Sequence, residues 1–412
     1  MRITTLLRRL VGVMSMFVTA VRWDGGDLVL SVRPHWMWPR CGECGRRAPG
    51  YDHKPDPRRW RALSYGTVKV FLEYAVRRVQ CRRCQGVRVE QVPWAAHGSW
   101  FTRPFEELIA YHAQVTDRTS VCKMLGVSWE AVGTVVRHVV DRTLDDDRLH
   151  GVTRIGIDEF SYRKRHRYVT VVVDHDSKRV IWAGKGRGAA TLFEFFDLLG
   201  EEGVKRLKLA TIDMAGGYKK ALAERAPHVK VVYDRFHVQR LASVAVDEVR
   251  RALWRDMKGT AAGKEIKGSR FVLLKNSRAL TRDERARLST IQKTNQKLYR
   301  AYLLKESLAA ALNYKQTARA RRALDDWLVW ASHSRLPSFV KCARTIRAHK
   351  EGILAYIKER ATNAVVEGFN TRMRAVARRA YGFHTASALI GMMYLCLGGI
   401  QLNPPLPVPT QP

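Results

Sequence analysis

Three aspartates, Asp158, Asp213 and Asp234, each follow a run of apolar and β-branched residues that is typical of a strand. Ligands of open α/β sheets bind outside the carboxyl ends of the strands, so acids at those ends can share one site. Aspartate is also a common turn or helix N-cap residue, which accounts for any single member of the set without a function. The presence of an aspartate after each of three strand-like segments favours one site that all three share.

A fourth acid, Glu367, lies in a segment whose apolar residues recur at the spacing of an amphipathic helix. Another face of this predicted helix collects polar residues: Asn363, Glu367, Asn370, Arg374 and Arg378. A solvated face held by salt bridges is the alternative interpretation. Glu367 is the only acid after residue 360, however, and this isolation favours a function.

Two aspartates and a glutamate at one edge of a sheet suit Mg²⁺, or Mn²⁺ in its place, because hard cations prefer carboxylate oxygens. Two such ions stabilise both the attacking and the leaving oxygen when a phosphodiester is displaced in line. The nucleophile would be water or a 3′-hydroxyl, and the phosphodiester would belong to DNA.

The charge balance of the chain indicates a polyanionic partner. Its 412 residues include 73 Lys and Arg against 38 Asp and Glu, a formal net charge of +35. The hydrophobic fraction of 46% supports several folded domains and excludes disordered and collagen-like classes. The excess is largest between residues 235 and 360, which hold 29 basic and 11 acidic side chains. Such a segment would grip the DNA backbone.

The elements that would position the acids alternate along residues 152–234. Strand-like segments at 154–160, 168–174 and 179–184 are joined by short links, which predicts an antiparallel meander. Helices and strands then alternate, and helical crossovers place the last two strands parallel to the first. We therefore expect a mixed five-stranded α/β sheet, followed by a predominantly helical region up to residue 400.

Four of the seven cysteines form two CxxC pairs: Cys41, Cys44, Cys81 and Cys84. Four thiolates so arranged predict a closed structural Zn²⁺ site, and disulfides are the alternative. Neighbouring glycines permit the tight turns that zinc knuckles need: Gly42, Gly45 and Gly86. The remaining cysteines lie in apolar helical contexts and are expected to be buried: Cys122, Cys342 and Cys396.

Residues 116–140 are typical of a helix-turn-helix, with Gly126 in the turn and Ser128 able to cap the second helix. Valines at helical spacing would pack this helix inward: Val132, Val135 and Val136. The exposed residues would then meet DNA grooves or phosphates: Ser128, Trp129, Glu130, Thr134 and Arg137. Helix pairs of this shape are common, so a purely structural pair is the alternative.

Together these motifs resemble the ISL3 family of bacterial insertion-sequence transposases, within the DDE superfamily. The resemblance covers nearly the whole chain and is carried by Ile-Asp158-Glu-Phe-Ser, Ile-Asp213-Met, Tyr-Asp234-Arg-Phe-His237-Val and Asn363-Ala-Val-Val-Glu367-Gly-Phe-Asn370. It implies a ribonuclease-H-like core with Asp158, Asp213 and Glu367 as the metal-binding triad. Asp234 and His237 resemble the family's D-x-F-H element, in which His237 contacts the scissile phosphate or satisfies a core hydrogen bond. The long basic helical region resembles the all-α insertion with which DDE transposases hold transposon ends.

The predicted multidomain organisation has six segments: a β-rich zinc module at 1–95, a helix-turn-helix domain at 100–148, the first part of the core at 152–235, a basic helical insertion at 236–358, the catalytic-glutamate helix and C-terminal helix of the core at 359–402, and a Pro-rich tail at 403–412. The apolar stretch after Arg9 superficially resembles a signal peptide, but it reads better as a strand, a turn at 24–26 and a second strand. The apolar run at 388–400 is too short to span a bilayer. We therefore expect a cytoplasmic, nucleoid-associated protein without membrane contact.

The expected function is that of a DNA transposase that binds terminal inverted repeats, cleaves DNA strands with a divalent metal and joins the liberated 3′-hydroxyl to a target. Asn370 and Arg374 are further expected DNA contacts. Synapsis of two ends predicts a homodimer or a higher oligomer on DNA. Two alternatives remain: a zinc and helix-turn-helix regulator with an inactive core, and a ribonuclease-H-like host nuclease such as a junction resolvase.

Overall fold

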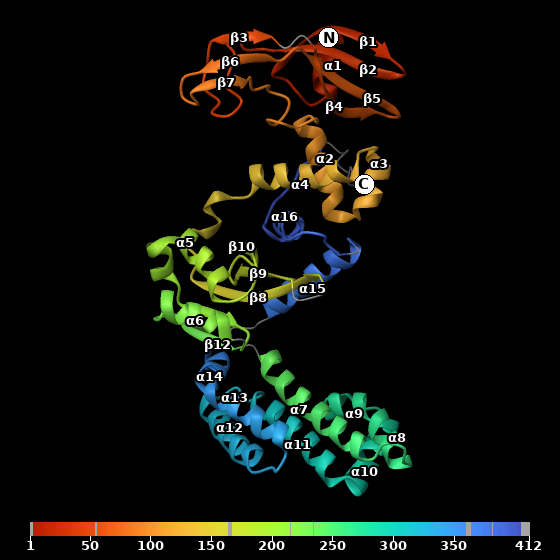
Figure 1. The fold of residues 1–412 in the computed structure, drawn as a ribbon, viewed down its shortest axis with the longest axis vertical. Helices are drawn as coiled ribbons and strands as arrows, with labels where there is room; N and C mark the ends of the chain where they lie inside the picture. Colours follow the sequence, from red (N-terminus) through yellow and green to blue (C-terminus); the bar gives the residue numbers. More distant parts are fainter. Residues whose placement is uncertain are drawn as a thin grey trace, which may run out of the picture. The chain divides into compact units, whose positions relative to one another are not determined.

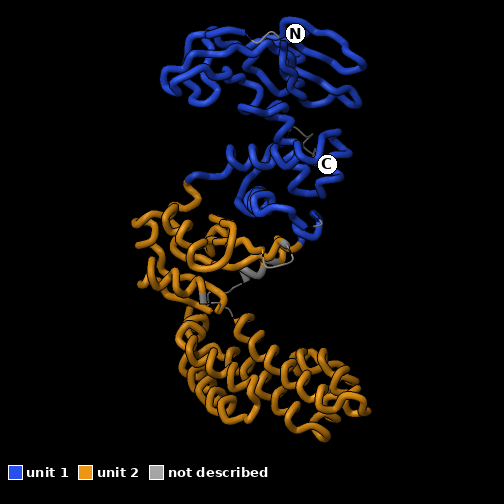
Figure 2. Tube along the Cα trace, in the orientation of Figure 1, with its two compact units in different colours: residues 1–146, 375–412 blue, residues 147–374 orange. Residues whose placement is uncertain are grey.

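The computed structural model describes residues 3–53, 56–163, 167–214, 216–233, 235–359, 364–380 and 382–404. The chain divides into two compact units: unit 1 combines residues 1–146 with 375–412, and unit 2 spans residues 147–374 (Figure 2). Within the described ranges, every helix is too short or too polar to cross a membrane.

Unit 1 opens with a four-stranded sheet in the order β1-β2-β5-β4 (Figure 1). Helix α1 (Ile3–Leu10) precedes the strands β1 (Met16–Asp24), β2 (Asp27–Pro34), β4 (Arg58–Tyr65) and β5 (Val68–Tyr74). The predicted strand-turn-strand is confirmed, since β1 and β2 pair antiparallel across Gly25 and Gly26. Both glycines have positive φ, +58° and +91°, which other residues rarely adopt. The sheet packs over a core that includes the buried pair Trp60 and Trp94.

A second, three-stranded sheet consists of β3 (Gly50–His53), β6 (Arg77–Cys81) and β7 (Gly86–Val89). The buried apolar cluster beneath it, among the described residues, is small: Cys41, Ala48, Val79 and Cys81. So little apolar burial does not stabilise a sheet by itself, and small modules of this kind depend on an added constraint such as a metal.

Besides α1, four helices lie entirely within the described part of unit 1: α2 (Arg103–Val115), α3 (Arg118–Leu125), α4 (Trp129–Thr143) and α16 (Ala386–Leu397). Helix α16, which belongs to the predicted core segment 359–402, packs against α2 and α4 within unit 1. Gln114 of α2 donates a hydrogen bond to the Leu395 carbonyl at 2.7 Å. Because α16 is apolar on most sides, it must be covered by several neighbours, and the valine face of α4 supplies one of them.

Unit 2 contains the predicted mixed five-stranded sheet, in the order β10-β9-β8-β11-β12. Its strands are β8 (Arg154–Arg163), β9 (Arg167–Asp174), β10 (Val180–Lys185), β11 (Leu209–Ile212) and β12 (Lys230–Tyr233). The first three form an antiparallel meander, and β11 is parallel to both β8 and β12. The crossover helices are α5 (Ala189–Arg206), kinked at Gly200, and α6 (Gly216–Arg225).

The expectation that Asp158 ends its strand is wrong, because β8 continues to Arg163. Beyond Asp158 the strand still pairs with β9, for example Phe160 with Val169, whereas β11 pairs only with the first part of β8. Asp158 therefore lies where the central sheet stops and a two-stranded extension continues.

A run of helices follows β12: α7 (Arg235–Asp256), α8 (Ala261–Gly268), α9 (Arg270–Leu274), α10 (Arg282–Thr294), α11 (Gln296–Ala311), α12 (Thr317–Ser332), α13 (Pro337–Ala348) and α14 (Lys350–Glu359). Helix α7 is the central member and packs against α8, α11 and α13. The run returns to the sheet when α14 packs on β12, with Gly352 so close to the Tyr233 ring that a Cβ there would lie 2.5 Å from it. Helix α15 (Ala364–Arg379) comes next.

Candidate active site, metal cluster and nucleic-acid interface

Asp158 lies in β8, and Asp213 is the residue that follows β11. The two aspartates lie beside each other because β8 and β11 are parallel neighbours. Thr211 pairs with Gly156, so the same register brings Asp213 level with Asp158. Both carboxylates are partly buried. Each Oδ1 accepts a hydrogen bond from the next backbone N–H, at 2.7 Å for Asp158 and 2.5 Å for Asp213, which fixes the orientation of the side chains.

His237 joins this pair from the first turn of α7. Its Nδ1 lies 3.2 Å from Oδ1 of Asp213. The predicted site residue Asp234 lies outside the described residues, as do the side chains of Glu367 and Asn370. The structure thus brings together three of the sequence-predicted residues: Asp158, Asp213 and His237.

Two further charged residues, Glu159 and Arg187, contribute to the electrostatics around Asp158 and Asp213. Neither was assigned a role from the sequence. Burial raises the pKa of Glu159 above its ordinary value, and the charges of Asp158 and Asp213 raise it further, while Arg187 lowers it. The Arg187 guanidinium carbon also lies 4.5 Å from the centre of the Tyr168 ring. Glu159 could have been found because it belongs to the Ile-Asp-Glu-Phe motif. Arg187 lies in a glycine-rich loop, and no other feature of the sequence points to it.

A buried hydroxyl pair anchors that loop and α6 to the sheet. The Tyr218 hydroxyl lies 2.9 Å from Oγ1 of Thr170, which donates to the Gly186 carbonyl at 3.0 Å. Gly217 packs against Gly188 so closely that a Cβ would lie 2.7 Å from the Gly188 Cα. The crossover helices α5 and α6 therefore begin beside the sheet edge that carries Asp158 and Asp213. A side chain larger than that of glycine would not fit at position 217.

Helix α15 has the amphipathic character expected of the segment around Glu367. Its apolar residues Phe369, Met373 and Val376 are buried, and Arg374 is exposed. The backbone places Glu367 in the first turn of this helix.

The four paired cysteines form a compact cluster in unit 1. Their sulfur atoms all lie within 4.8 Å of one another, with Sγ–Sγ distances of 3.9 Å between Cys41 and Cys84 and 3.6 Å between Cys44 and Cys81. Sulfurs around tetrahedral zinc, each at about 2.3 Å from the ion, lie about 3.8 Å apart. The cysteines are free rather than disulfide-bonded, so the disulfide alternative does not hold. The backbone N–H of Cys84 lowers the pKa of Cys81 to about 7, whereas burial raises the pKa of Cys84 to about 12.

The turns of the cluster use the glycines differently from the prediction. Gly45 has a φ of +68°, as a knuckle turn requires, but in the second knuckle the positive φ falls on Gln85 (+47°) rather than Gly86. Gly42 is needed for close approach instead, since a Cβ there would lie 2.5 Å from Nδ1 of His97. Of the other cysteines, Cys342 is buried as expected, whereas Cys122 and Cys396 are only partly buried.

Local capping defines the helix-turn-helix of α3 and α4. Asp117 caps α3 by accepting from the Ser120 N–H at 2.9 Å, and Ser128 caps α4 by accepting from the Ala131 N–H at 3.2 Å. Gly126 ends α3 in the left-handed conformation, with φ of +58°. The valine face of α4 is buried: Val132, Val135, Val136, Val139 and Val140.

The opposite face of α4 presents the expected DNA contacts. Ser128, Trp129, Glu130 and Arg137 are exposed and Thr134 is partly buried. Ser128 and Thr134 line a cleft of about 690 Å³ whose other wall is formed by β4, β5 and residues 98–101. The first turns of α4 therefore border the outer face of the N-terminal sheet.

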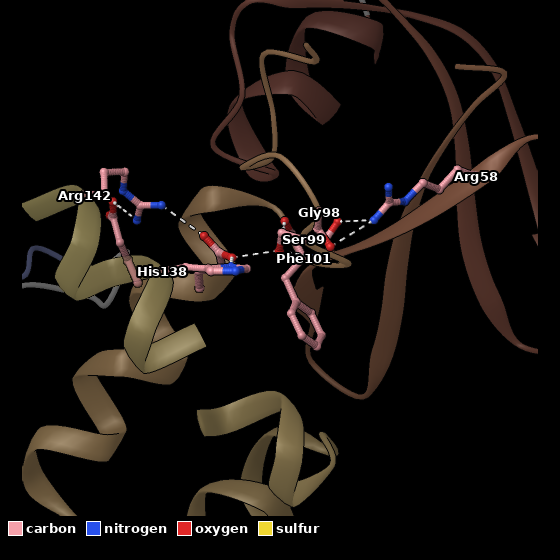
Figure 3. A network of polar contacts seen from close by, with 8 residues as sticks. Arg58, Gly98, Ser99, Phe101, His138 and Arg142 are labelled. Atoms are coloured by element: carbon pink, nitrogen blue, oxygen red, sulfur yellow. Dashed lines mark hydrogen bonds and ion pairs between the residues drawn. The ribbon is translucent and has the colours of Figure 1, made fainter. Parts of the chain in front are cut away.

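A buried carboxylate ties α2, α4 and the segment before α2 together (Figure 3). Glu106 is fully buried and accepts from the Ser99 hydroxyl at 2.7 Å and from Arg142 at 3.0 Å, while Nδ1 of His138 lies 3.2 Å away. Arg58 of β4 donates to the Ser99 carbonyl at 2.6 Å. The network connects the sheet to the helix-turn-helix through residues that pack inside unit 1.

Comparison with known proteins agrees with this organisation. A transposase family model, that of the DDE domain of ISL3 elements, matches residues 155–393. A model described as the zinc-finger of transposases IS204/IS1001/IS1096/IS1165 matches residues 39–84, and one described as the helix-turn-helix domain of transposase family ISL3 matches residues 90–140.

Two curated relatives extend over most of the chain. The transposase for insertion sequence element IS1557 of Mycobacterium tuberculosis is 38% identical over 400 residues, covering 91% of this chain and 90% of the relative. The transposase for insertion sequence element IS1001 of Bordetella parapertussis is 29% identical over 383 residues, covering 92% and 94%. These matches favour the transposase over the regulator and host-nuclease alternatives. The chain belongs to the ISL3 family of insertion-sequence transposases and carries the family's zinc ribbon, helix-turn-helix and DDE domains.

Proposed function

We propose that Asp158, Asp213 and Glu367 form the catalytic metal site of a ribonuclease-H-like core, and that the helices α7–α14 are an insertion in that core. The observation that carries the proposal is the parallel register of β8 and β11, which puts Asp158 beside Asp213. The same sheet order places β8 at the centre, flanked by β9 and β11. In this proposal the core comprises residues 152–235 and 359–402, the latter with the catalytic-glutamate helix and the C-terminal helix, and residues 236–358 are the basic insertion.

The donor chemistry of the two aspartates fits Mg²⁺ or Mn²⁺. Carboxylates from adjacent positions offer hard oxygen ligands, and their backbone hydrogen bonds hold them in place without neutralising them. When bound, the metal would lower the pKa of water or of a 3′-hydroxyl and stabilise charge on the phosphodiester. His237 positions Asp213, and Arg187 and Glu159 shape the charge around it. Asp234 belongs to the proposed catalytic set with His237 through the D-x-F-H element.

In the proposed reaction, water first cleaves a strand at the element's end, and the liberated 3′-hydroxyl then attacks target DNA. Each step exchanges one P–O bond for another, and the displaced oxygen leaves on the opposite side of the phosphorus. The chain contributes orientation of the nucleophile and of the phosphodiester, since its own carboxylates form no covalent bond to DNA.

DNA binding is divided among several surfaces in this proposal. The helix-turn-helix reads the terminal inverted repeats through Ser128, Trp129, Thr134 and Arg137, supported by the zinc ribbon on Cys41, Cys44, Cys81 and Cys84. Asn370 and Arg374 of α15 and the basic insertion contact the DNA near the active site. Two copies of the chain, or a higher oligomer, hold the two ends in the nucleoid.

Alanine substitution of each acid tests the proposal. D158A, D213A and E367A are expected to abolish Mg²⁺- or Mn²⁺-dependent cleavage of DNA that contains an element end, and to keep end binding. The matched control is D176A, because Asp176 is exposed in the turn after β9 and pairs with Arg154. If any of the three alanine variants still cleaves DNA, the assignment of that residue to the metal site is wrong.

A further inference from the structure

The exposed ridge of α4 lies between two arginines from other elements. On the 3.6-residue repeat of the helix, Glu130 and Arg137 form the centre of the exposed face. Ala131 and Thr134 fall on one side of it, facing the cleft, and Trp129 and Gly133 fall on the other side. One arginine borders each side.

Arg61 of β4 borders the cleft side. Its Nη1 donates to the Gly126 carbonyl of the helix-turn-helix turn at 2.7 Å, and its guanidinium carbon lies 4.9 Å from the centre of the Phe105 ring. The Nε atom is buried and has no hydrogen-bond partner among the described residues. Arg61 therefore joins the N-terminal sheet to the turn that precedes α4.

Arg118, the first residue of α3, borders the other side. Its guanidinium carbon lies 3.5 Å from the centre of the Trp129 ring, a cation–π contact that covers one face of the indole. It also lies against Gly133, where a Cβ would come within 2.1 Å of Nη2. Its Nε is likewise buried without a hydrogen-bond partner in the described part of the chain.

Neither arginine is neutralised within the described residues. Burial lowers the pKa of both guanidinium groups. Asp27 opposes this shift for Arg61, and Glu130 opposes it for Arg118, but neither acid lies within 4.0 Å of its arginine as an ion pair. Arg59, two positions from Arg61 on the same face of β4, is the contrast, because it pairs with Asp24 at 2.7 Å and Glu73 at 2.9 Å. A partly desolvated cation without a counter-ion costs stability, and an anion that binds from outside would offset this cost.

We propose that Arg61 and Arg118 bind backbone phosphates of the two DNA strands that flank α4 when this helix lies in the major groove. A helix in that groove has a sugar-phosphate backbone along each of its sides. Trp129 then acts as the platform that orients Arg118, and the N-terminal sheet joins the DNA interface through Arg61. These contacts fix the register of the protein on the duplex and carry no sequence information.

This inference rests on DNA binding by the helix-turn-helix and not on the proposed metal site. Its test uses the full-length protein, a duplex that contains an element end and an unrelated duplex of equal length, with binding measured by fluorescence anisotropy over a series of salt concentrations. R61M and R118M are each expected to weaken binding to both duplexes by about tenfold. Each should also reduce the slope of log Kd against log salt concentration by about 1.

Three controls separate this role from a structural one. R59M should leave the salt slope unchanged, because Arg59 is already neutralised, and R61K and R118K should keep the slope by keeping the charge. The melting temperature of DNA-free R61M and R118M should stay close to that of the parent, because the removed cost of a partly buried charge offsets the lost Gly126 hydrogen bond or Trp129 ring contact. An unchanged salt slope, weakening on the end duplex alone, or a lower melting temperature with unchanged affinity would each overturn the proposal.

Discussion

Nδ1 of His237 lies 3.2 Å from Oδ1 of Asp213, which joins the first turn of α7 to the end of β11. Because residues that orient a metal-binding carboxylate tune its affinity, H237A should raise the Mg²⁺ concentration for half-maximal DNA cleavage by about 10- to 100-fold. Binding of end DNA should not change. The exposed His228 provides the control H228A, and equal Mg²⁺ dependence in both variants would show that His237 has no positioning role.

Zinc removal should unfold the ribbon. We expect one zinc ion per chain by elemental analysis, and C41S or C84S should lose it, because the cluster beneath the small sheet has little other stabilisation. C122S, which changes a partly buried cysteine outside the cluster, should retain the metal. A C41S protein that still binds zinc tightly and shields amides of β6 from exchange would contradict this prediction.

The Glu106 network should be a major source of stability in unit 1. E106Q leaves Arg142 and His138 without their buried charged partner, so we expect a loss of about 3 kcal/mol and a lower melting temperature. E107Q is the matched control, since Glu107 contacts the same arginine only at 3.5 Å from a more exposed position. That variant should stay within about 0.5 kcal/mol of the parent. Equal melting temperatures for the two variants would disprove the role of Glu106.

The sheet of unit 1 should lose stability in acid through Glu73. Hydrogen bonds from Arg22 and then from Arg59 lower the pKa of Glu73 to about 2, below the ordinary value of 4.5. A depressed pKa stabilises the folded state above the unfolded-state pKa, and this contribution disappears as the pH falls through the folded-state pKa. E73Q should therefore melt below the parent at neutral pH, and the difference should vanish between about pH 4.5 and pH 2. A difference that stays constant over this range would refute the electrostatic explanation.

Much of the five-stranded sheet of unit 2 could be predicted because local patterns decide it. The β-branched runs at 168–174 and 208–212 and the helical spacing between them leave few alternatives to β9, β11 and their crossovers. The capping of α4 by Ser128 was equally local. Asp158 was misplaced at a strand end because pairing of β8 with β9 beyond it depends on the partner strand, which sequence periodicity does not specify.

The errors and omissions all depend on tertiary contacts. The apolar pattern of α16 shows that the helix is buried but not against which neighbours, so its packing on α2 and α4 could not be derived. Arg187 acts on Glu159 from a loop whose Gly188 packs against Gly217, a contact that no local sequence pattern specifies. Arg61 lies in a strand that ends more than 60 residues before α4 begins, and no spacing rule links the two.

The central claim is that Asp158, Asp213 and Glu367 hold the catalytic metal. The most direct measurement is anomalous diffraction from Mn²⁺ in crystals of the full chain with uncleaved end DNA. The account predicts a manganese peak bound by carboxylate oxygens of all three residues, at about 2.1 Å as hard octahedral ions require. Manganese bound at another cluster, or no peak at this edge under conditions that support cleavage, would contradict it.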